Sequence, residues 1–223
     1  MTGPSFALIP VNRLDRAKGR LAELLTPTER RELALITFRT VLNAVRGAGW
    51  HTVVLTSDPA IAEAAGLTAH VLEEAPGVHG LNPQLEAAIA RLLPELDAAD
   101  DPRLLVLHAD LPLVTVSAVA GLTDAAGPRP SATAVRSADG GTNAMLLRPP
   151  GLFPLAYGES SFAKHAAAAH AAGVAFNVFE SEELALDLDT PADVAALLSS
   201  AAGRASAAGR HLLAAGVRSR LLT

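Results

Sequence analysis

Asp110 interrupts the apolar stretch LVLHADLPLV (Leu105–Val114) with a carboxylate, and Pro112 follows two residues later. Pro112 cannot donate a backbone hydrogen bond to a sheet, so the predicted strand ends close to this carboxylate. In open α/β sheets, ligands bind beyond the carboxyl ends of the strands. A carboxylate there suits Mg²⁺, a hard cation that prefers oxygen ligands. The alternative role is a cap for the next helix, but Thr115 can serve as that cap.

A second acidic segment, LALDLDTPAD, places Asp187 and Asp189 two positions apart. Residues with this spacing lie on the same side of an extended segment. Capping of the following helix accounts for Thr190 and Asp193. It does not account for two more carboxylates, whose repulsion needs a cation or hydrogen-bond donors to offset it. Asp110 with Asp187 or Asp189 is therefore a candidate Mg²⁺ site for polyphosphate chemistry.

The segment RLDRAKGRL supplies positive charge directly after the first predicted strand. At the carboxyl end of that strand, its cations would lie where the phosphates of a nucleotide bind. The alternative is a basic loop that only faces solvent, and the sequence does not distinguish this from a phosphate-binding loop. The cations are Arg13, Arg16, Lys18 and Arg20.

Glycines and hydroxyls gather in two further segments. YGESSF places Gly158, Ser160 and Ser161 before a predicted helix, whose N-terminus offers free N–H groups to an anion. In DGGTNA, the glycines allow backbone N–H groups to approach a carboxylate, and Thr142 adds a hydroxyl. A helix cap and a hairpin turn explain the same residues equally well. Asn82, in HGLNPQL, either caps another helix or contacts the edge of a nucleotide base.

Strands and helices alternate through the first half of the chain. Such alternation predicts right-handed β-α-β crossovers and a largely parallel sheet. Thr26, Pro27 and Glu29 predict a capped helix start close to a capping box. The expected strands cover residues 6–11, 51–57, 69–74 and 103–110, and the expected helices cover 26–47, 60–67 and 82–96.

The second half departs from strict alternation. Residues 131–137 and 143–149 flank the loop ADGGT and predict a strand-loop-strand insertion. A helix at 160–173 and a strand at 174–179 follow. Residues 184–200 are expected to begin as a strand and to end as a helix. The expected fold class is α/β, with a mostly parallel sheet flanked by helices.

Composition limits the class of protein. A chain of 223 residues with 50% hydrophobic residues suits one domain, here residues 1–198. The net charge of −5 argues against a nucleic-acid partner, and the absence of cysteine excludes a thiolate metal site. No stretch reaches transmembrane length, so we expect a cytoplasmic protein without a membrane partner. The Ala- and Arg-rich residues 199–223 are expected to form a frayed or disordered tail, with a helical tail as the alternative. The oligomeric state is open, with a homodimer among the options.

Together these motifs resemble one family. In chain order they are IPVNRLDRAKGRL, TPTERRELA, GLN, ADLPLV, DGGTNAMLLRPP, YGESSFAKHAAAA and LALDLDTP. The set is similar to the guanylyltransferases of coenzyme F-420 biosynthesis, which act on 2-phospho-L-lactate or phosphoenolpyruvate. The similarity runs from about residue 6 to residue 198. The chain departs from the family pattern at Asn12, where lysine is common.

The resemblance implies a nucleotidyltransferase-A-like, Rossmann-type fold and the transfer of a guanylyl group from GTP to a three-carbon phosphoacid. It also implies Mg²⁺ as cofactor, and Lys18, Arg20 and Asp110 as catalytic residues. Matched by motif, Thr142, Gly158 and Ser161 would bind the carboxylate of the phosphoacid, and Asp110 with Asp187 or Asp189 would bind the metal. The triphosphate of GTP would lie against Lys18, Arg20 and Arg13, and the guanine would lie against Asn82.

No covalent nucleophile with a paired base stands out, so the acceptor phosphate would attack GTP directly and release pyrophosphate. The Ala-rich composition resembles that of the family members that use phosphoenolpyruvate as the acceptor. The alternative acceptors are 2-phospho-L-lactate and 3-phosphoglycerate. Sugar-phosphate and molybdopterin nucleotidyltransferases are alternatives that usually carry a GGxGxR element, where this chain has RLDRAKGRL. A non-catalytic nucleotide sensor on the same fold is the remaining alternative.

Overall fold

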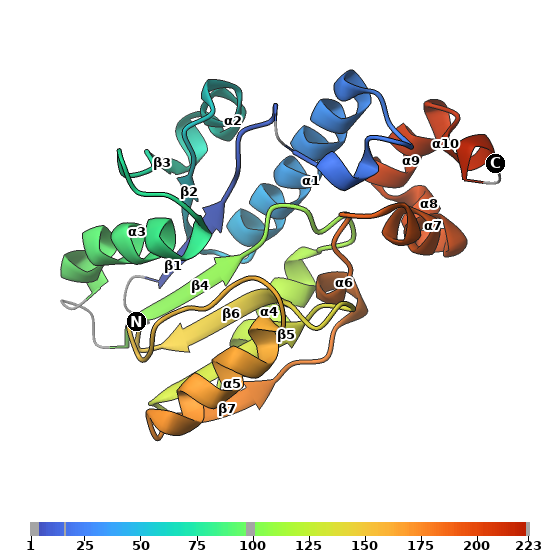
Figure 1. The fold of residues 1–223 in the computed structure, drawn as a ribbon. Coiled ribbons are helices and arrows are strands. Elements are labelled where there is room, and N and C mark those ends of the chain that lie inside the picture. The colour runs from blue at the N-terminus through green and yellow to red at the C-terminus, as the bar shows by residue number, and fades with distance from the viewer. Residues whose placement is uncertain (1–4, 16, 97–100, 222–223) are drawn as a thin grey trace.

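A seven-stranded sheet forms the centre of the computed structural model, which describes residues 5–15, 17–96 and 101–221 (Figure 1). The strand order is β3-β2-β1-β4-β6-β5-β7. Strand β6 runs antiparallel to both of its neighbours, and the other pairs are parallel. The strands are β1 (Ser5–Pro10), β2 (His51–Leu55), β3 (His70–Leu72), β4 (Arg103–Leu107), β5 (Ser131–Arg136), β6 (Thr142–Arg148) and β7 (Ala175–Val178).

Helices cover both faces of this sheet, which confirms the predicted α/β class. Successive residues of β1 point to opposite faces, as the pleat requires. Ile9 packs in a core with α1 and α4, whereas Leu8 packs in a second core with α3 and α5. The helices are α1 (Pro27–Gly47), α2 (Pro59–Ala65), α3 (Leu81–Leu96), α4 (Val116–Asp124), α5 (Ser161–Ala171), α6 (Glu182–Ala185), α7 (Pro191–Ser199), α8 (Ala201–Ala205), α9 (Ala207–Ala214) and α10 (Val217–Arg220), with short 3₁₀ turns at Gly19–Leu21 and Gly66–Thr68. None of the helices in the described ranges is long and apolar enough to cross a membrane.

Local sequence signals account for several element boundaries. At the start of α1, Thr26 Oγ1 accepts from the Glu29 backbone N–H at 3.3 Å, and Glu29 Oε2 accepts from the Thr26 N–H at 2.8 Å. This reciprocal pair is the predicted capping box. The predicted strand-loop-strand unit is also present, as the antiparallel pair β5–β6.

The strand expected after residue 184 is wrong. The chain instead forms the short helix α6 and then runs without a ladder through residues 186–190. Individual contacts satisfy its backbone there: the Asn143 amide donates to Leu184 O and Ala185 O, and Leu188 N–H donates to Asp110 O at 3.2 Å. A buried backbone needs partners, but they need not be another strand.

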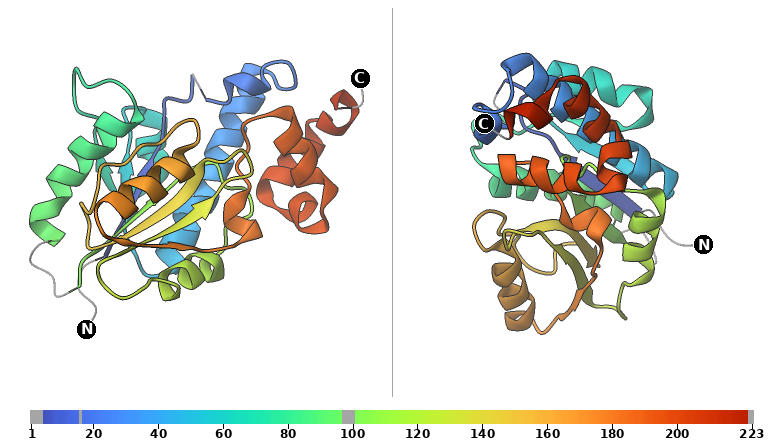
Figure 2. Two further views of the ribbon diagram at one scale, coloured as in Figure 1. Left: turned by 60° about the horizontal axis from the view of Figure 1, so that its bottom comes forward. Right: turned by 90° about the vertical axis from the view of Figure 1, so that its right-hand side faces the viewer.

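Between residues 201 and 220 the C-terminal tail forms the helices α8, α9 and α10, in place of the expected disordered extension. Figure 2 shows α7 to α10 gathered at one end of the molecule, beside α1. Leu212 and Val217 are fully buried in a third core, which also contains Leu21 and Leu24 of the loop after β1. The tail folds because these leucines, which are distant in the sequence, cover its apolar side chains.

Two serine caps build the turns between the tail helices. Ser200 Oγ accepts from Gly203 N–H at 2.8 Å, and Ser206 Oγ accepts from Gly209 N–H at 3.0 Å. A Cβ atom on Gly203 would lie 1.8 Å from Leu197 O, so only glycine allows α7 and α8 to approach this closely. The serines that suggested disorder are therefore helix caps, and Gly203 and Gly209 lie in the first turns of the helices that they cap.

Candidate active site

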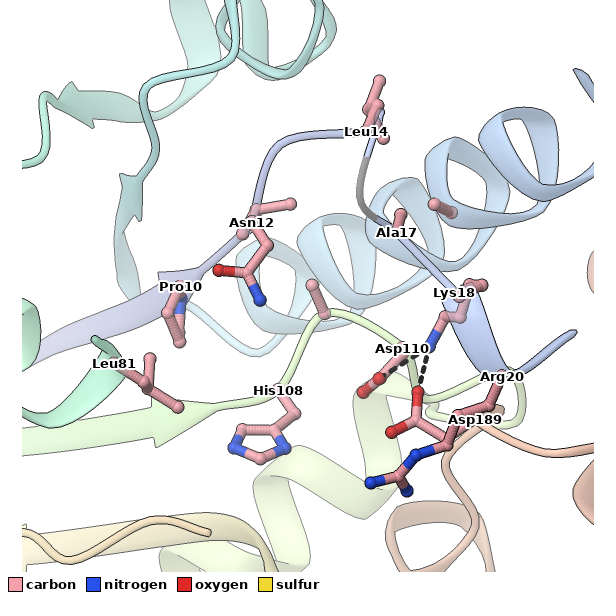
Figure 3. A pocket seen from close by; sticks show the side chains of 14 residues that line it. Pro10, Asn12, Leu14, Ala17, Lys18, Arg20, Leu81, His108, Asp110 and Asp189 are labelled. Atoms are coloured by element: carbon pink, nitrogen blue, oxygen red, sulfur yellow. Dashed lines mark hydrogen bonds and ion pairs between the residues drawn. The ribbon is translucent and has the colours of Figure 1, made fainter. Parts of the chain in front are cut away.

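A cavity of about 550 Å³ opens beyond the carboxyl ends of β1 and β4. Its size lies within the usual range for small-molecule sites. Asn12, Lys18 and Arg20 line it from the loop after β1, and Asp110 lines it from the loop after β4 (Figure 3). The basic loop after β1 and the acidic end of β4 therefore face the same cavity.

Three carboxylates lie close together beside this cavity, and two of them, Asp110 and Asp189, line it. One oxygen each from Asp110, Asp187 and Asp189 lies within 4.8 Å of the others. Asp110 Oδ1 is buried and has no hydrogen-bond partner within the described part of the chain. A buried carboxylate oxygen without a partner is costly, and a divalent cation would remove that cost. This donor set of oxygens fits a hard cation such as Mg²⁺.

The electrostatics of the three acids also favour a bound cation. Burial, and then repulsion from Asp110, raise the pKa of Asp187 to about 6. Burial alone would raise the pKa of Asp110, but the neighbouring Lys18 ammonium outweighs it and lowers that pKa. Two like charges at close range resist ionising together unless positive charge lies between them.

Lys18 supplies positive charge to this cluster. Its Nζ donates to Asp110 Oδ2 at 2.7 Å and to Asp189 Oδ1 at 3.0 Å, and its side chain is only 6% exposed. Burial opposes its charged form, but Asp110 and Asp189 outweigh that effect and raise the pKa of Lys18. Its backbone lies in the left-handed region, at φ 55°. Such a conformation costs a non-glycine residue on the order of 1 kcal/mol or more, and it persists where surrounding contacts hold it.

The other cations of the loop lie in different positions. Arg20 lines the main cavity together with Lys18. Arg13 is exposed, contacts Asp15 at 3.3 Å, and lines a neighbouring cavity of about 320 Å³. Asn12 lines both cavities, so the residue that departs from the family pattern faces both. Arg16 lies outside the described residues.

Contacts from three sides hold the loop after β1. Asp58 Oδ2 accepts from Leu14 N–H at 2.8 Å, which fixes the loop to the start of α2. Arg220 of the tail donates to Leu24 O at 3.0 Å. Together with the ion pairs of Lys18, these bonds hold the loop at Leu14, at Lys18 and at Leu24.

The residues expected to bind a carboxylate also come together. Ser161 Oγ donates to Thr142 Oγ1 at 3.3 Å, and Ser161 N–H donates to Gly158 O at 3.0 Å. Gly158 has φ +120°, a conformation that L side chains rarely adopt. A Cβ atom on Gly141 would lie 3.7 Å from Ser161 Oγ, so the β5–β6 loop lies against the start of α5.

Asn143 connects the two groups of residues, a role that the sequence did not suggest. Its Nδ2 lies 3.3 Å from Asp187 Oδ1, and its neighbour Thr142 belongs to the hydroxyl pair. Its backbone O accepts from His108 N–H at 3.0 Å. The only signal in the sequence was a polar residue at the start of the apolar strand TNAMLLR.

Asn82 lies inside the first turn of α3 and forms a closed pair of bonds with a neighbouring loop. Its Nδ2 donates to Tyr157 O at 2.9 Å, and its Oδ1 accepts from Tyr157 N–H at 2.7 Å. Asn82 therefore ties α3 to the residue that precedes Gly158. Its assignment to the guanine stays a prediction.

Comparison with known proteins identifies the family. The family model described as "Guanylyl transferase CofC like" matches residues 5–214. This chain belongs to that family. The match continues through α8 and α9, beyond the boundary expected at residue 198. The chain is therefore a guanylyltransferase, a kind of nucleotidyltransferase, and the non-catalytic sensor is set aside.

Curated relatives carry two names. The phosphoenolpyruvate guanylyltransferase of Rubrobacter xylanophilus is 43% identical over 194 residues, 86% of this chain and 92% of that protein. The enzyme of the same name from Sphaerobacter thermophilus is 40% identical, over 85% of this chain and 90% of that protein. The 2-phospho-L-lactate guanylyltransferase of Methanothermobacter thermautotrophicus is 33% identical, over 86% of this chain and 83% of that protein.

Solved structures agree on the fold. A protein of Desulfovibrio desulfuricans described as a nucleotide-diphospho-sugar transferase aligns with a TM-score of 0.77 at 16% identity and covers 98% of both chains. A nucleotidyl transferase from Methanothermobacter aligns with a TM-score of 0.61 at 20% identity, over 87% of this chain and 95% of the other. The nucleotidyltransferase-like fold expected from the resemblance is confirmed.

Proposed function

We propose that this protein joins phosphoenolpyruvate to GTP, giving enolpyruvyl-2-diphospho-5'-guanosine and pyrophosphate, as a step of coenzyme F-420 biosynthesis in the cytoplasm. One observation carries the proposal. Asn143 contacts the carboxylate cluster and the adjacent Thr142 contacts Ser161, so two successive residues of β6 connect the group that would bind a cation to the group that would bind an anion. An acceptor with a phosphate at one end and a carboxylate at the other needs both.

The chain's own residues would position the reactants. Asp110, Asp187 and Asp189 would hold Mg²⁺, which neutralises phosphate charge when bound. Lys18 and Arg20 line the cavity where the GTP triphosphate would lie, and their charges would stabilise the departing pyrophosphate. Thr142, Gly158 and Ser161 would form the site for the carboxylate of the acceptor, with Ser161 contributing through its bond to the Thr142 hydroxyl.

The reaction needs no covalent intermediate with the protein. An oxygen of the acceptor phosphate forms a bond to the α-phosphorus of GTP, while the bond from that phosphorus to the bridging oxygen of pyrophosphate breaks. Both reactants are anionic, so alignment and charge neutralisation carry most of the catalysis. Correct alignment of two reactants can contribute about 7–11 kcal/mol to lowering a barrier.

The identity of the acceptor is the most specific part of the proposal. Phosphoenolpyruvate, 2-phospho-L-lactate and 3-phosphoglycerate share a carboxylate and a phosphate, so the proposed binding residues would hold all three alike. The relatives at 43% and 40% identity carry the phosphoenolpyruvate name, which supports that acceptor. The relative at 33% identity carries the phospholactate name and supplies the competing hypothesis.

A competition experiment tests the proposal. The protein is incubated with GTP, Mg²⁺ and equimolar amounts of the three acids, and the guanylated products are identified by mass spectrometry. The enolpyruvyl product should dominate, with release of one pyrophosphate per product. A dominant phospholactyl product would overturn the acceptor and leave the guanylyltransferase activity in place. Parallel reactions with Mn²⁺ or Ca²⁺ in place of Mg²⁺ test the metal.

A further inference from the structure

His165 is a fully buried histidine on α5, and both of its ring nitrogens are hydrogen-bonded. Nδ1 lies 3.0 Å from Thr142 Oγ1, and Nε2 accepts from the Ala156 backbone N–H at 2.9 Å. The resemblance to the family assigned Thr142 but gave His165 no role. The ring therefore joins a proposed acceptor-binding hydroxyl to the loop that precedes Gly158.

The bond from Ala156 fixes the tautomer of this ring. A backbone N–H can only donate, so Nε2 must carry the lone pair. In a neutral imidazole the proton then resides on Nδ1, which donates to Thr142 Oγ1. Burial, followed by the effects of His108 and Lys164, lowers the pKa of His165 to about 4, so the ring is neutral near pH 7.

The tautomer in turn decides how Thr142 can bond. A hydroxyl has one hydrogen to donate and two lone pairs to accept with. Thr142 Oγ1 accepts from His165 Nδ1–H and from Ser161 Oγ–H, which uses both lone pairs. Its own hydrogen is left for a third group, and within the described residues no acceptor is recorded for it. With the opposite tautomer, Thr142 would donate to Nδ1 and present only lone pairs, which repel an anion.

We propose that His165 is a positioning residue that makes Thr142 a hydrogen-bond donor to the carboxylate of the acceptor. This inference rests on the proposed function, because it takes the acceptor to be a carboxylate-bearing phosphoacid. It assigns the buried histidine to substrate recognition through Thr142, not to proton transfer. The imidazole would not touch the acceptor itself.

A matched set of variants tests which ring nitrogen matters. His165→Asn places an amide N–H near the position of Nδ1, whereas His165→Gln places its amide near the position of Nε2. His165→Phe removes both polar atoms and keeps the ring volume. In the Gln and Phe variants nothing at the Nδ1 position holds the Thr142 hydroxyl as a donor, so the KM for phosphoenolpyruvate should rise by up to about 10- to 100-fold, the effect of losing the bond from Thr142 to the charged carboxylate. It should stay within a few-fold of wild type in the Asn variant, and the KM for GTP should change little in all three.

A double-mutant cycle with Thr142→Val separates positioning from a structural role. If His165 acts through the Thr142 hydroxyl, then His165→Phe should have no further effect on that KM once the hydroxyl is gone. Additive losses, or an equal rise in the KM for GTP, would overturn the inference. Circular dichroism and melting curves establish that each variant is folded under the assay conditions.

The tautomer itself can be measured in the wild-type protein, so the test does not depend on variants that fold. In protein labelled with ¹⁵N-histidine, one of the seven histidines should show a protonated Nδ1 and an unprotonated Nε2 near pH 7 and should lose its signal in His165→Asn. A protonated Nε2 would overturn the inference whatever the kinetics. A wild-type protein that guanylylates none of the three acids would instead overturn the proposed function, and the inference with it.

Discussion

Lys18 Nζ lies 2.7 Å from Asp110 Oδ2, and this bond joins the basic loop after β1 to the acidic strand end of β4. The other oxygen of the same carboxylate, Oδ1, is buried and unpaired within the described residues. A cation could therefore bind Asp110 through Oδ1 while Lys18 keeps Oδ2. The pair places the lysine beside the metal site and at the cavity where the triphosphate would lie.

Replacement of Lys18 tests this placement. In Lys18→Ala, the apparent KM for GTP should rise about tenfold or more, because a buried charge-assisted contact to phosphate is lost. The KM for the phosphoacid should rise less. Lys164→Ala is the matched control, since Lys164 is exposed on α5. Initial rates over a matrix of both substrates measure the two constants, and an unchanged dependence on GTP would move the triphosphate away from this loop.

Asp110→Asn tests the metal assignment. The change keeps the shape of the side chain but removes the anionic ligand, so turnover should fall by about 100-fold or more even at saturating Mg²⁺. The fold should stay intact, because Leu188 N–H bonds to the backbone O of Asp110, the amide oxygen of Asn can still accept from Lys18 Nζ, and Lys18 keeps its ion pair with Asp189. Asp124→Asn, at an exposed position of α4, is the control. Near-normal turnover of the Asp110 variant would contradict the assignment.

The sequence predicted the parts of the site that stand at strand ends. Asp110 and the pair Asp187 and Asp189 were recognisable because acids directly after apolar runs have no role in a core. The strand expected at the start of residues 184–200 is wrong, and there the Asn143 amide, from a distant segment, satisfies the carbonyls of Leu184 and Ala185. Such a contact depends on the three-dimensional arrangement, which no local pattern encodes.

Two other features were hidden for different reasons. His165 and His170 both lie in the Ala-rich run SFAKHAAAAHAAG, and nothing in that pattern distinguishes the buried histidine from the exposed one. The tail looked disordered because its small residues outnumber its apolar ones. Leu212 and Val217 are buried only because Leu21 and Leu24, far away in the sequence, cover them.

Removal of residues 204–223 should therefore lower the stability of the protein. It would expose Leu21 and Leu24 and remove the bond from Arg220 to Leu24 O. The single change Leu212→Ala should lower the free energy of unfolding by about 2–5 kcal/mol, the usual cost of a cavity at a fully buried leucine. Urea titration measures both effects. A truncated protein with unchanged stability would show that the tail contributes no net packing energy.

The docking of the tail should also depend on pH through Glu29 and Arg220. Arg220 Nη1 donates to Glu29 Oε2 at 2.9 Å, and Nη2 donates to Oε1 at 3.0 Å. This bond, followed by the Thr26 backbone N–H, lowers the pKa of Glu29 from 4.5 to about 2. A carboxylate whose pKa is lower in the folded state stabilises the fold fully above its unfolded pKa, and that contribution disappears as the pH falls through the folded pKa.

Comparison with Arg220→Gln isolates this contribution from the other acids. In this variant Glu29 loses the bond that contributes most to lowering its pKa. The difference in unfolding free energy between wild type and variant should therefore be largest above about pH 5 and should shrink between pH 4.5 and pH 2. Arg218→Gln, at an exposed position of the same helix, should show no such narrowing. Urea titrations of the three proteins across that range give the differences directly. A difference that stays constant with pH would mean that Arg220 stabilises the tail through contacts such as those with the carbonyls of Leu24 and Ala215, and not through Glu29.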